Sequence, residues 1–172
     1  PVELASPLVT ACTATLLPGN RLLTNRHCFY PPDLRALGFE FVQEARVSFG
    51  YVSEDDTSGV QTYSVLTQEI SADTDLDAMI LQIVGGDANE DVGGHFPLRM
   101  QTEVRPFQEL KIVHFPNGQP QRYSSGTCKV HRAQRDLSEE ATSLRHTCET
   151  TLGSSGSLIL DGRSLSVVGL HN

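Results

Sequence analysis

Short apolar stretches, separated by frequent turn residues, are the feature of this sequence that most limits its fold. They alternate apolar and polar side chains or are apolar throughout, and their lengths are typical of β-strands. The stretches are residues 8–17, 21–24, 45–51, 61–70, 77–84, 110–114, 123–130, 157–160 and 164–171. No long segment has the periodicity of an amphipathic helix. The sequence therefore predicts an all-β fold built as an antiparallel sandwich or barrel.

Turn residues also divide the chain into two parts. Residues 85–91 are polar and contain two adjacent glycines, and another glycine pair follows shortly after. We therefore place a boundary between two lobes within residues 85–105. With 172 residues, 38% of them hydrophobic, the chain is long enough to bury a core as one domain or as two small lobes that share an interface.

Composition excludes several classes of partner. The formal net charge is −8 and no basic block is present, which argues against nonspecific nucleic-acid binding. No stretch approaches the ~18 apolar residues that a membrane-spanning helix needs. The N-terminus lacks the pattern of a signal peptide, although a signal removed before residue 1 would leave no trace.

Three polar motifs stand at the ends of apolar stretches. His27 follows a predicted strand, Asp75 and Asp77 precede another, and the run Gly153-Ser154-Ser155-Gly156-Ser157 precedes a third. Each has an ordinary interpretation: a surface or capping histidine, or a flexible glycine-serine connector. The alternative for the run is a tight bend that exposes one hydroxyl. A carboxylate at a buried strand edge is costly unless it is hydrogen-bonded.

Together, the three motifs resemble those of the trypsin-like serine peptidases, in the same chain order. The matching segments are CTATLLPGNRLLTNRHC, DLDAMILQI and GSSGS. The resemblance covers nearly the whole chain and implies a chymotrypsin-like double antiparallel β-barrel, with residues 1–172 as one peptidase domain. Residues 1–90 would form the first barrel and residues 105–172 the second. LLTNRH and GSSGS are most similar to the bacterial glutamyl endopeptidase branch.

The resemblance implies a catalytic triad of His27, Asp77 and Ser155. His27 would be the general base, Asp77 would orient its imidazole, and Ser155 would be the nucleophile. Asp75 is the alternative orienting acid, but Asp77 would then occupy a position where the family has a small buried residue. The backbone N–H groups of Gly153 and Ser155 would form the oxyanion hole. Such an enzyme cleaves proteins or peptides and needs no cofactor and no metal.

The resemblance also points to the residues that select the substrate. Thr150 and His171 match a threonine and a histidine of glutamyl endopeptidases, and together they would bind a glutamate or aspartate before the cleaved bond. Glu149 argues against this preference. If its carboxylate pointed into the pocket, it would repel an acidic side chain and favour arginine or lysine. We expect Glu149 to point out of the pocket.

The sequence departs from digestive trypsins in two places. Ser154 occupies the position of an aspartate that pairs with a new N-terminus on activation, and Pro1 does not begin a matching Ile-Val-Gly-Gly terminus. Family members also continue beyond the strand that ends near His171 with a further strand and usually a helix. We therefore expect the C-terminal end of the second barrel to be missing: either the chain is trimmed at Asn172, or the remaining part lies on another segment beyond residue 172.

Four cysteines permit three disulfide pairings. The resemblance pairs Cys12 with Cys28, and Cys128 with Cys148 then follows by elimination. If both bridges form, the protein belongs in an oxidising space, secreted or periplasmic; reduced cysteines packed as small hydrophobes would indicate the cytoplasm. A zinc site is disfavoured because no two cysteines have the close spacing of structural zinc sites.

The remaining polar features match no motif. We expect the other histidines to be loop or surface residues; they are His95, His114, His131 and His146. Residues 132–146 carry charges of both signs and are predicted to form a solvated loop or short helix. The alternative to an active endopeptidase is an inactive module that keeps the fold for binding or as a scaffold.

Overall fold

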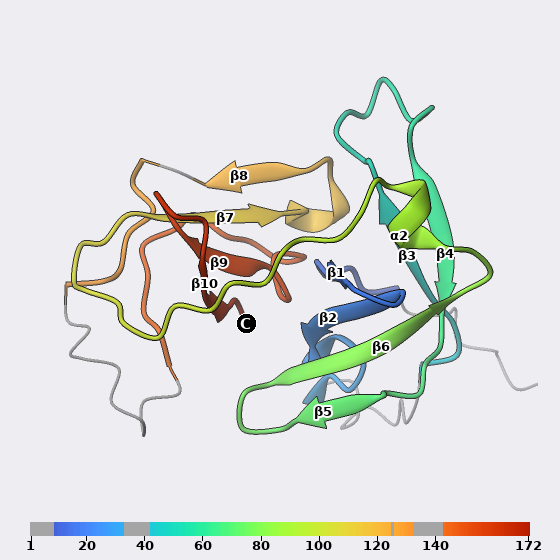
Figure 1. Cartoon of the computed structure of the whole chain (residues 1–172), viewed down its shortest axis with the longest axis horizontal. Coiled ribbons are helices and arrows are strands. Elements are labelled where there is room, and N and C mark those ends of the chain that lie inside the picture. The colour runs from blue at the N-terminus through green and yellow to red at the C-terminus, as the bar shows by residue number, and fades with distance from the viewer. Residues whose placement is uncertain (1–8, 33–41, 125, 133–142) are drawn as a thin grey trace, which may run out of the picture.

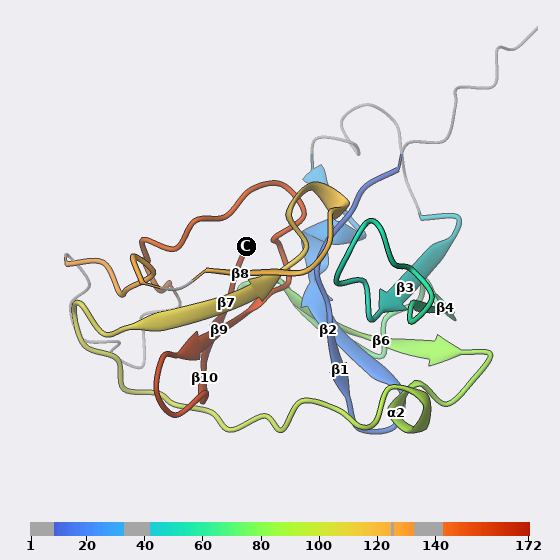
Figure 2. The same cartoon turned by 90° about the horizontal axis from the view of Figure 1, so that it is seen from above.

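Two antiparallel sheets, lying side by side, make up the regular structure of the computed structural model (Figures 1 and 2). It describes residues 9–32, 42–124, 126–132 and 143–172. The all-β class predicted from the apolar stretches is confirmed. Among the described residues, no helix is long and apolar enough to cross a membrane.

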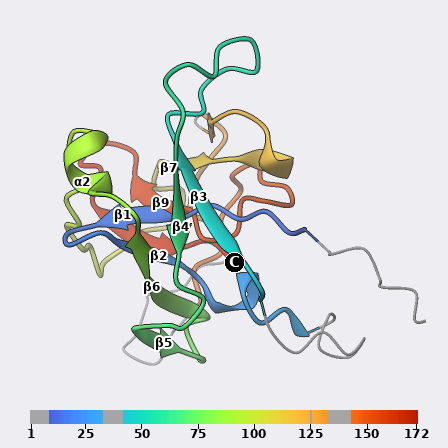
Figure 3. The same ribbon diagram turned by 90° about the vertical axis from the view of Figure 1, so that its right-hand side faces the viewer.

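The first sheet comes from the N-terminal half of the chain. Its strands are β1 (Thr15–Leu17), β2 (Arg21–Asn25), β3 (Ala45–Phe49), β4 (Gln61–Val65), β5 (Ser71–Asp73) and β6 (Ala78–Val84). The order is β1-β2-β6-β4-β3, with β5 also paired to β6. β6 buries every second side chain, Met79, Leu81 and Ile83, which alternation in a strand requires. The sheet curls, so that β3 and β4 run steeply across β1 (Figure 3).

The β1–β2 hairpin places the residues that follow β2. Gly19 and Asn20 both have positive φ angles, +74° and +56°, which the tight connection of a twisted hairpin favours. The hairpin pairs Leu17 with Arg21, and β2 then pairs along its full length with β6. β2 ends in the short 3₁₀ helix η1 (Arg26–Cys28), so His27 leaves the sheet at a fixed point.

The second sheet comes from the C-terminal half. Its strands are β7 (Leu110–His114), β8 (Arg122–Ser124), β9 (Leu158–Asp161) and β10 (Val167–Leu170), in the order β10-β9-β7-β8. The turn between β7 and β8 is the 3₁₀ helix η2 (Pro116–Gly118). β7 buries Leu110, Ile112 and His114 on one side. The expectation that His114 lies in a loop or at the surface is therefore wrong: it is the third inward residue of a buried strand.

The segment between the sheets contains the helix α2 (Ala88–Asp91), capped by the Asp87 carboxylate, which accepts a hydrogen bond from the Glu90 amide at 3.3 Å. Leu23 of β2 packs against an apolar cluster of the second sheet that contains Leu158 and Leu160 of β9. The strand before His27 therefore lies against the strand that follows the Gly153–Ser157 run.

The predicted strands agree with the observed ones in position but not in length. The stretches 8–17 and 123–130 contain only short strands, β1 and the end of β8, and the sequence did not predict β5. Residues 133–142 of the charged segment lie outside the described residues. Both predicted disulfides, Cys12–Cys28 and Cys128–Cys148, are present.

Candidate active site

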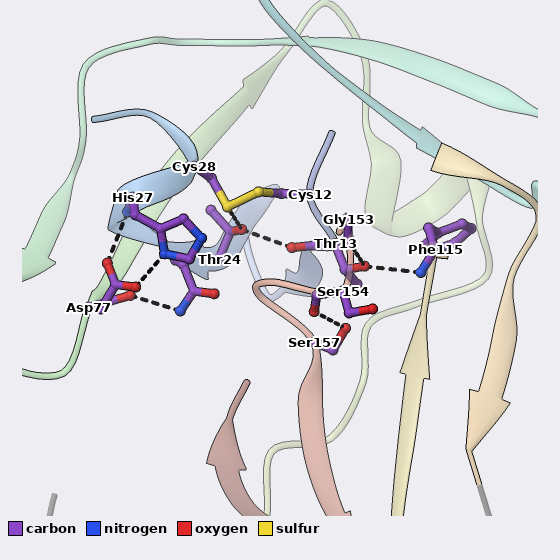
Figure 4. Close-up of a disulfide and its surroundings, with 11 residues drawn as sticks. Cys12, Thr13, Thr24, His27, Cys28, Asp77, Phe115, Gly153, Ser154 and Ser157 are labelled. Atoms are coloured by element: carbon purple, nitrogen blue, oxygen red, sulfur yellow. Dashed lines mark hydrogen bonds and ion pairs between the residues drawn. A yellow bond between two sulfur atoms is a disulfide. The ribbon is translucent and has the colours of Figure 1, made fainter. Parts of the chain in front are cut away.

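His27 and Asp77 are held together by two hydrogen bonds (Figure 4). The Asp77 carboxylate contacts the His27 ring, with 2.5 Å between Nδ1 and Oδ2, and accepts the His27 backbone N–H at 2.9 Å. Both hydrogen bonds are accepted by the Asp77 carboxylate, which therefore fixes the imidazole and the start of η1 together. Asp75 is exposed and its amide N–H donates to Asp73. The acid that contacts the histidine is therefore Asp77.

Asp77 has an unusual backbone conformation, with φ of +49°. Its carbonyl oxygen accepts hydrogen bonds from the Asn25 side-chain amide at 2.9 Å and from the Arg26 N–H at 3.0 Å. A non-glycine residue at such a φ angle needs support from its surroundings. The three consecutive residues Asn25, Arg26 and His27 supply it, by holding Asp77 at both its carbonyl and its carboxylate.

Asn25 is a residue of this site that sequence reasoning missed. Its side chain is 0% exposed, and its Oδ1 is the one buried side-chain atom without a hydrogen-bond partner in the part of the chain described here. A buried unpaired acceptor costs about 1–3 kcal/mol. Position alone gives no signal for it, because asparagine at the end of an apolar strand is common at turns.

The Gly153–Ser157 run folds as a loop against the first sheet. The Thr13 N–H donates to the Ser155 carbonyl at 2.8 Å, and the Thr13 hydroxyl donates to the Gly153 carbonyl at 2.8 Å. Gly156 lies so close that a Cβ there would overlap Thr13 O and Thr24 Oγ1, and its φ is +86°. The run is therefore a tightly packed bend, and the flexible-connector interpretation is wrong.

Thr13 and Thr24 connect this loop to His27 (Figure 4). The Thr24 hydroxyl donates to the Thr13 carbonyl at 2.8 Å, and Thr24 lies in β2 just before η1. The Cys12–Cys28 disulfide, with 6.2 Å between its Cα atoms, joins the neighbours of Thr13 and His27. The fold thus brings the Ser155 loop next to the histidine. Ser155 is half-buried, and within the described ranges its hydroxyl makes no hydrogen bond to His27.

Two carbonyl oxygens of the loop, those of Leu152 and Ser154, accept hydrogen bonds from neighbouring residues. The Asn117 N–H donates to the Leu152 carbonyl at 2.5 Å, and the Ser154 carbonyl accepts from the Ser157 hydroxyl at 2.6 Å. In a trans peptide the N–H points opposite to the carbonyl. The N–H groups that follow, those of Gly153 and Ser155, therefore point away from these partners, and neither donates to an acceptor among the described residues.

His171 lies directly beside the loop. Its carbonyl accepts the Gly156 N–H at 2.8 Å and its N–H donates to the Ser157 carbonyl at 2.9 Å. Its ring contacts that of His146, with 3.2 Å between His171 Nδ1 and His146 Nε2. His146 lies outside the named strands, in agreement with the expected loop position, but it is half-buried and paired, which the sequence did not predict.

The protons of this histidine pair follow from its contacts. Burial, together with the nearby His146, His114 and His27, lowers the pKa of His171 to about 4, and burial lowers the pKa of His146. Both rings are therefore neutral at pH 7. The Cys148 N–H donates to His146 Nδ1 at 3.2 Å, so the proton of His146 is on Nε2 and points at His171 Nδ1. The proton of His171 is then on its own Nε2.

The two other predicted pocket residues lie just before the loop. Glu149 is exposed, and its carbonyl accepts the Ser124 hydroxyl at 2.6 Å. Thr150 is half-buried. The Cys128–Cys148 disulfide fixes the start of this segment, since Cys128 is 1% exposed in the core of the second sheet.

Sulfur and nitrogen atoms of Cys12, His27 and Cys28 lie within 4.8 Å of one another, which resembles a metal-binding group. The two cysteines form a disulfide with each other, so neither provides the thiolate that binds a metal. Of these three residues, only His27 could then bind a metal.

Comparison with known proteins agrees with this geometry. Residues 12–170 match the trypsin-like peptidase domain family. The chain belongs to this family. Substrates of the family are proteins or peptides, which agrees with the predicted class of partner. No curated protein sequence matches the chain.

Solved structures show that the fold of this trypsin-like domain is chymotrypsin-like. A Glu endopeptidase in complex with MPD is 22% identical over 95% of this chain and 74% of that one, with a TM-score of 0.66. The MamO protease domain from Magnetospirillum magneticum is 15% identical over 96% and 78%, with a TM-score of 0.64. The thermostable serine protease AL20 from an extremophilic microorganism is 16% identical over 92% and 74%, with a TM-score of 0.63.

Proposed function

We propose that this trypsin-like domain is a serine endopeptidase that uses His27, Asp77 and Ser155. The observation that carries the proposal is the paired contact of the Asp77 carboxylate with the ring and the backbone of His27. Asp77 accepts the Nδ1 proton, which leaves the Nε2 lone pair as the base. A binding module has no need for an acid that fixes one tautomer of a histidine.

In the first step, the Ser155 oxygen forms a bond to the carbonyl carbon of the substrate, and its proton moves to His27 Nε2. The carbonyl π-bond electrons move to oxygen, where the N–H groups of Gly153 and Ser155 hydrogen-bond the developing charge. Because the carbonyls of both peptide groups are already held, these donors need little reorganisation.

In the second step, His27 gives its proton to the leaving nitrogen as the C–N bond breaks, and an ester of Ser155 remains. A water molecule then attacks the ester carbonyl while His27 takes its proton, and Ser155 leaves with that proton restored. The missing hydrogen bond between Ser155 and His27 does not argue against these steps, since such bonds often tighten only with substrate bound.

An acidic side chain before the cleaved bond fits the residues near the loop. His171 carries its proton on Nε2, and the half-buried Thr150 adds a hydroxyl donor. Two neutral donors suit a carboxylate without a buried fixed charge. Glu149 is exposed, which supports its placement outside the pocket. The alternative, cleavage after arginine or lysine, requires the Glu149 carboxylate to turn inward.

A serine-reactive fluorophosphonate probe tests the reaction. The parent chain should be labelled, and Ser155→Ala should lose labelling and at least about 1000-fold in peptide cleavage. Ser58→Ala, which removes an exposed hydroxyl, is the matched control and should behave like the parent. A folded parent that is never labelled would instead identify the chain as a non-catalytic binding module.

A peptide library that places each of the twenty amino acids directly before the cleaved bond tests the preference for an acidic side chain. We expect cleavage after glutamate or aspartate, and loss of that preference in His171→Ala. Cleavage after arginine or lysine alone would contradict the acidic pocket and leave the triad intact.

A further inference from the structure

The residue before the proposed nucleophile is tied to the second sheet by a buried, uncharged contact. Ser154 is 0% exposed, and its Oγ lies 2.7 Å from Nδ1 of His114, which is 5% exposed at the end of β7. The same Oγ accepts the Thr151 N–H at 3.1 Å, and the Ser154 N–H donates to the Thr151 carbonyl at 3.0 Å. The turn 151–154 is thus closed on itself and fastened to β7.

The proton in this contact is assigned by counting donors. The Ser154 hydroxyl has one proton, and the described residues offer it no acceptor other than His114 Nδ1. Burial lowers the pKa of His114, so the ring is neutral at pH 7. If Nδ1 carried the ring proton, the hydroxyl proton would be buried without a partner, which is costly. Ser154 therefore donates to Nδ1, and the ring proton is on Nε2.

Ser154 lies between the two N–H groups proposed for the oxyanion hole. Its carbonyl is held by Ser157, and the peptide that follows this carbonyl carries the Ser155 N–H. A rotation of Ser154 would therefore move the Ser155 N–H and the adjacent Gly153 peptide together. In digestive trypsins this position is an aspartate paired with an ammonium group, whereas here the contact is neutral on both sides.

We propose that His114 is a positioning residue that holds the nucleophile loop in its working conformation through the Ser154 hydroxyl. His114 does not touch the substrate. It acts by fixing the Thr151–Ser155 turn on β7, so that the loop is formed without a buried ion pair. This role rests on the proposed peptidase function for its effect on rate, but the fixed loop is a property that can be measured without activity.

The test compares His114→Phe, which keeps a ring but removes both nitrogens, with His114→Asn, which keeps a polar atom near the Nδ1 position. Hydrogen exchange of the segment 150–157 measures the loop, and kcat and KM for a peptide measure its consequence. We expect His114→Phe to speed exchange and to lower kcat about 100-fold with KM nearly unchanged, because a small misplacement of reacting groups has an effect of that size. His114→Asn should recover most of both.

The controls separate positioning from packing. His95→Phe changes an exposed histidine and should leave exchange and kcat unchanged. Ser154→Ala removes only the hydroxyl. If His114→Phe fails to fold, the comparison of Ser154→Ala with the parent is the test. The double variant His114→Phe/Ser154→Ala should be no slower than the slower single variant, because both remove the same contact.

Two outcomes would overturn the proposal. Exchange and kcat of both His114→Phe and Ser154→Ala within about twofold of the parent would show that His114 only fills space, since real coupling exceeds such a change. Additive losses in the double variant would show that the two residues act separately. A parent that is never labelled by the fluorophosphonate, but whose loop exchanges faster in His114→Phe, would contradict the peptidase function and leave the positioning role in place.

Discussion

The two halves of the proposed site are held by different means. On the first sheet, His27 and Asp77 are joined by side-chain and backbone hydrogen bonds that come from three consecutive residues. On the second, Ser155 has no such side-chain partner among the described residues, and its loop is placed by close packing against Thr13 together with the contact between Ser154 and His114. The acid–base half thus depends on polar groups, whereas the nucleophile half also depends on the absence of a side chain at Gly156.

The largest effect is expected in the polar half. Asp77→Asn should lower kcat by about 10⁴, as the same exchange does in the chymotrypsin-type triad, because the amide stabilises the wrong tautomer of His27. Stability should change little, since an amide keeps the shape of the carboxylate. Steady-state kinetics with urea unfolding measures both. Asp75→Asn is the matched control, and a comparable loss there would contradict the assignment of Asp77.

In the nucleophile half, a steric clash should cause the loss of activity. Gly156→Ala places a Cβ against the Thr13 carbonyl and the Thr24 hydroxyl, so the loop must shift, and we expect kcat to fall at least about 100-fold. Gly85→Ala is the control: its φ of +87° is nearly the same as at Gly156, but a Cβ there meets nothing within 4 Å. Equal losses of activity in the two variants would show that the packing against Thr13 does not position Ser155.

The sequence could predict those features of the two halves that depend on local patterns. Strand positions and the Gly153–Ser157 bend follow from local patterns of apolar, glycine and turn residues. The family resemblance favoured Asp77 over Asp75, because with Asp75 as the orienting acid Asp77 would be an unpaired acid at a position where the family has a small buried residue. These features depend on a few neighbouring residues, and the structure agrees with them.

Contacts between distant segments could not be predicted in this way. The sequence assigns no role to Thr13, Asn25 or His114, and each meets a partner at least 40 positions away in the chain: Gly153, Asp77 and Ser154 respectively. One signal for His114 was present: a serine replaces the family's aspartate at Ser154, and a buried polar residue needs a partner. The inward alternation of β7 could have directed attention to His114.

The histidine pair of the second half should make stability depend on pH. The pKa of His171 is lowered from 6.5 to about 4 in the folded chain. As the pH falls through 6.5, the unfolded chain binds this proton first, so stability is lost between pH 6.5 and about 4 and is fully present above that window. Between pH 7 and pH 5, urea unfolding of the parent should lose about 2 kcal/mol more than that of His171→Gln, at 1.36 kcal/mol per pKa unit. His95→Gln should follow the parent, and an equal loss in parent and His171→Gln would contradict the assignment.

The smallest effect concerns Asn25, which holds the backbone of Asp77 and not its carboxylate. Asn25→Leu keeps the size of the side chain but removes the Nδ2 donor and the unpaired Oδ1. Loss of the donor leaves the Asp77 carbonyl with one hydrogen bond. Loss of the unpaired oxygen removes the free-energy cost of burying an acceptor without a partner. These contributions oppose each other, so we expect the free energy of unfolding to change by less than about 1 kcal/mol.

Activity should respond more clearly than stability in this variant. Asp77 keeps a strained φ of +49°, and with one support removed its carboxylate holds His27 less firmly. We expect kcat to fall about tenfold with KM unchanged, because only the orientation of the proposed general base is affected. In the double variant Asn25→Leu/Asp77→Asn the Asn25 loss should disappear, since Asn25 acts through Asp77. A tenfold loss that persists in the double variant would mean that Asn25 supports the site by another route, and the polar half would then extend beyond the three residues that hold Asp77.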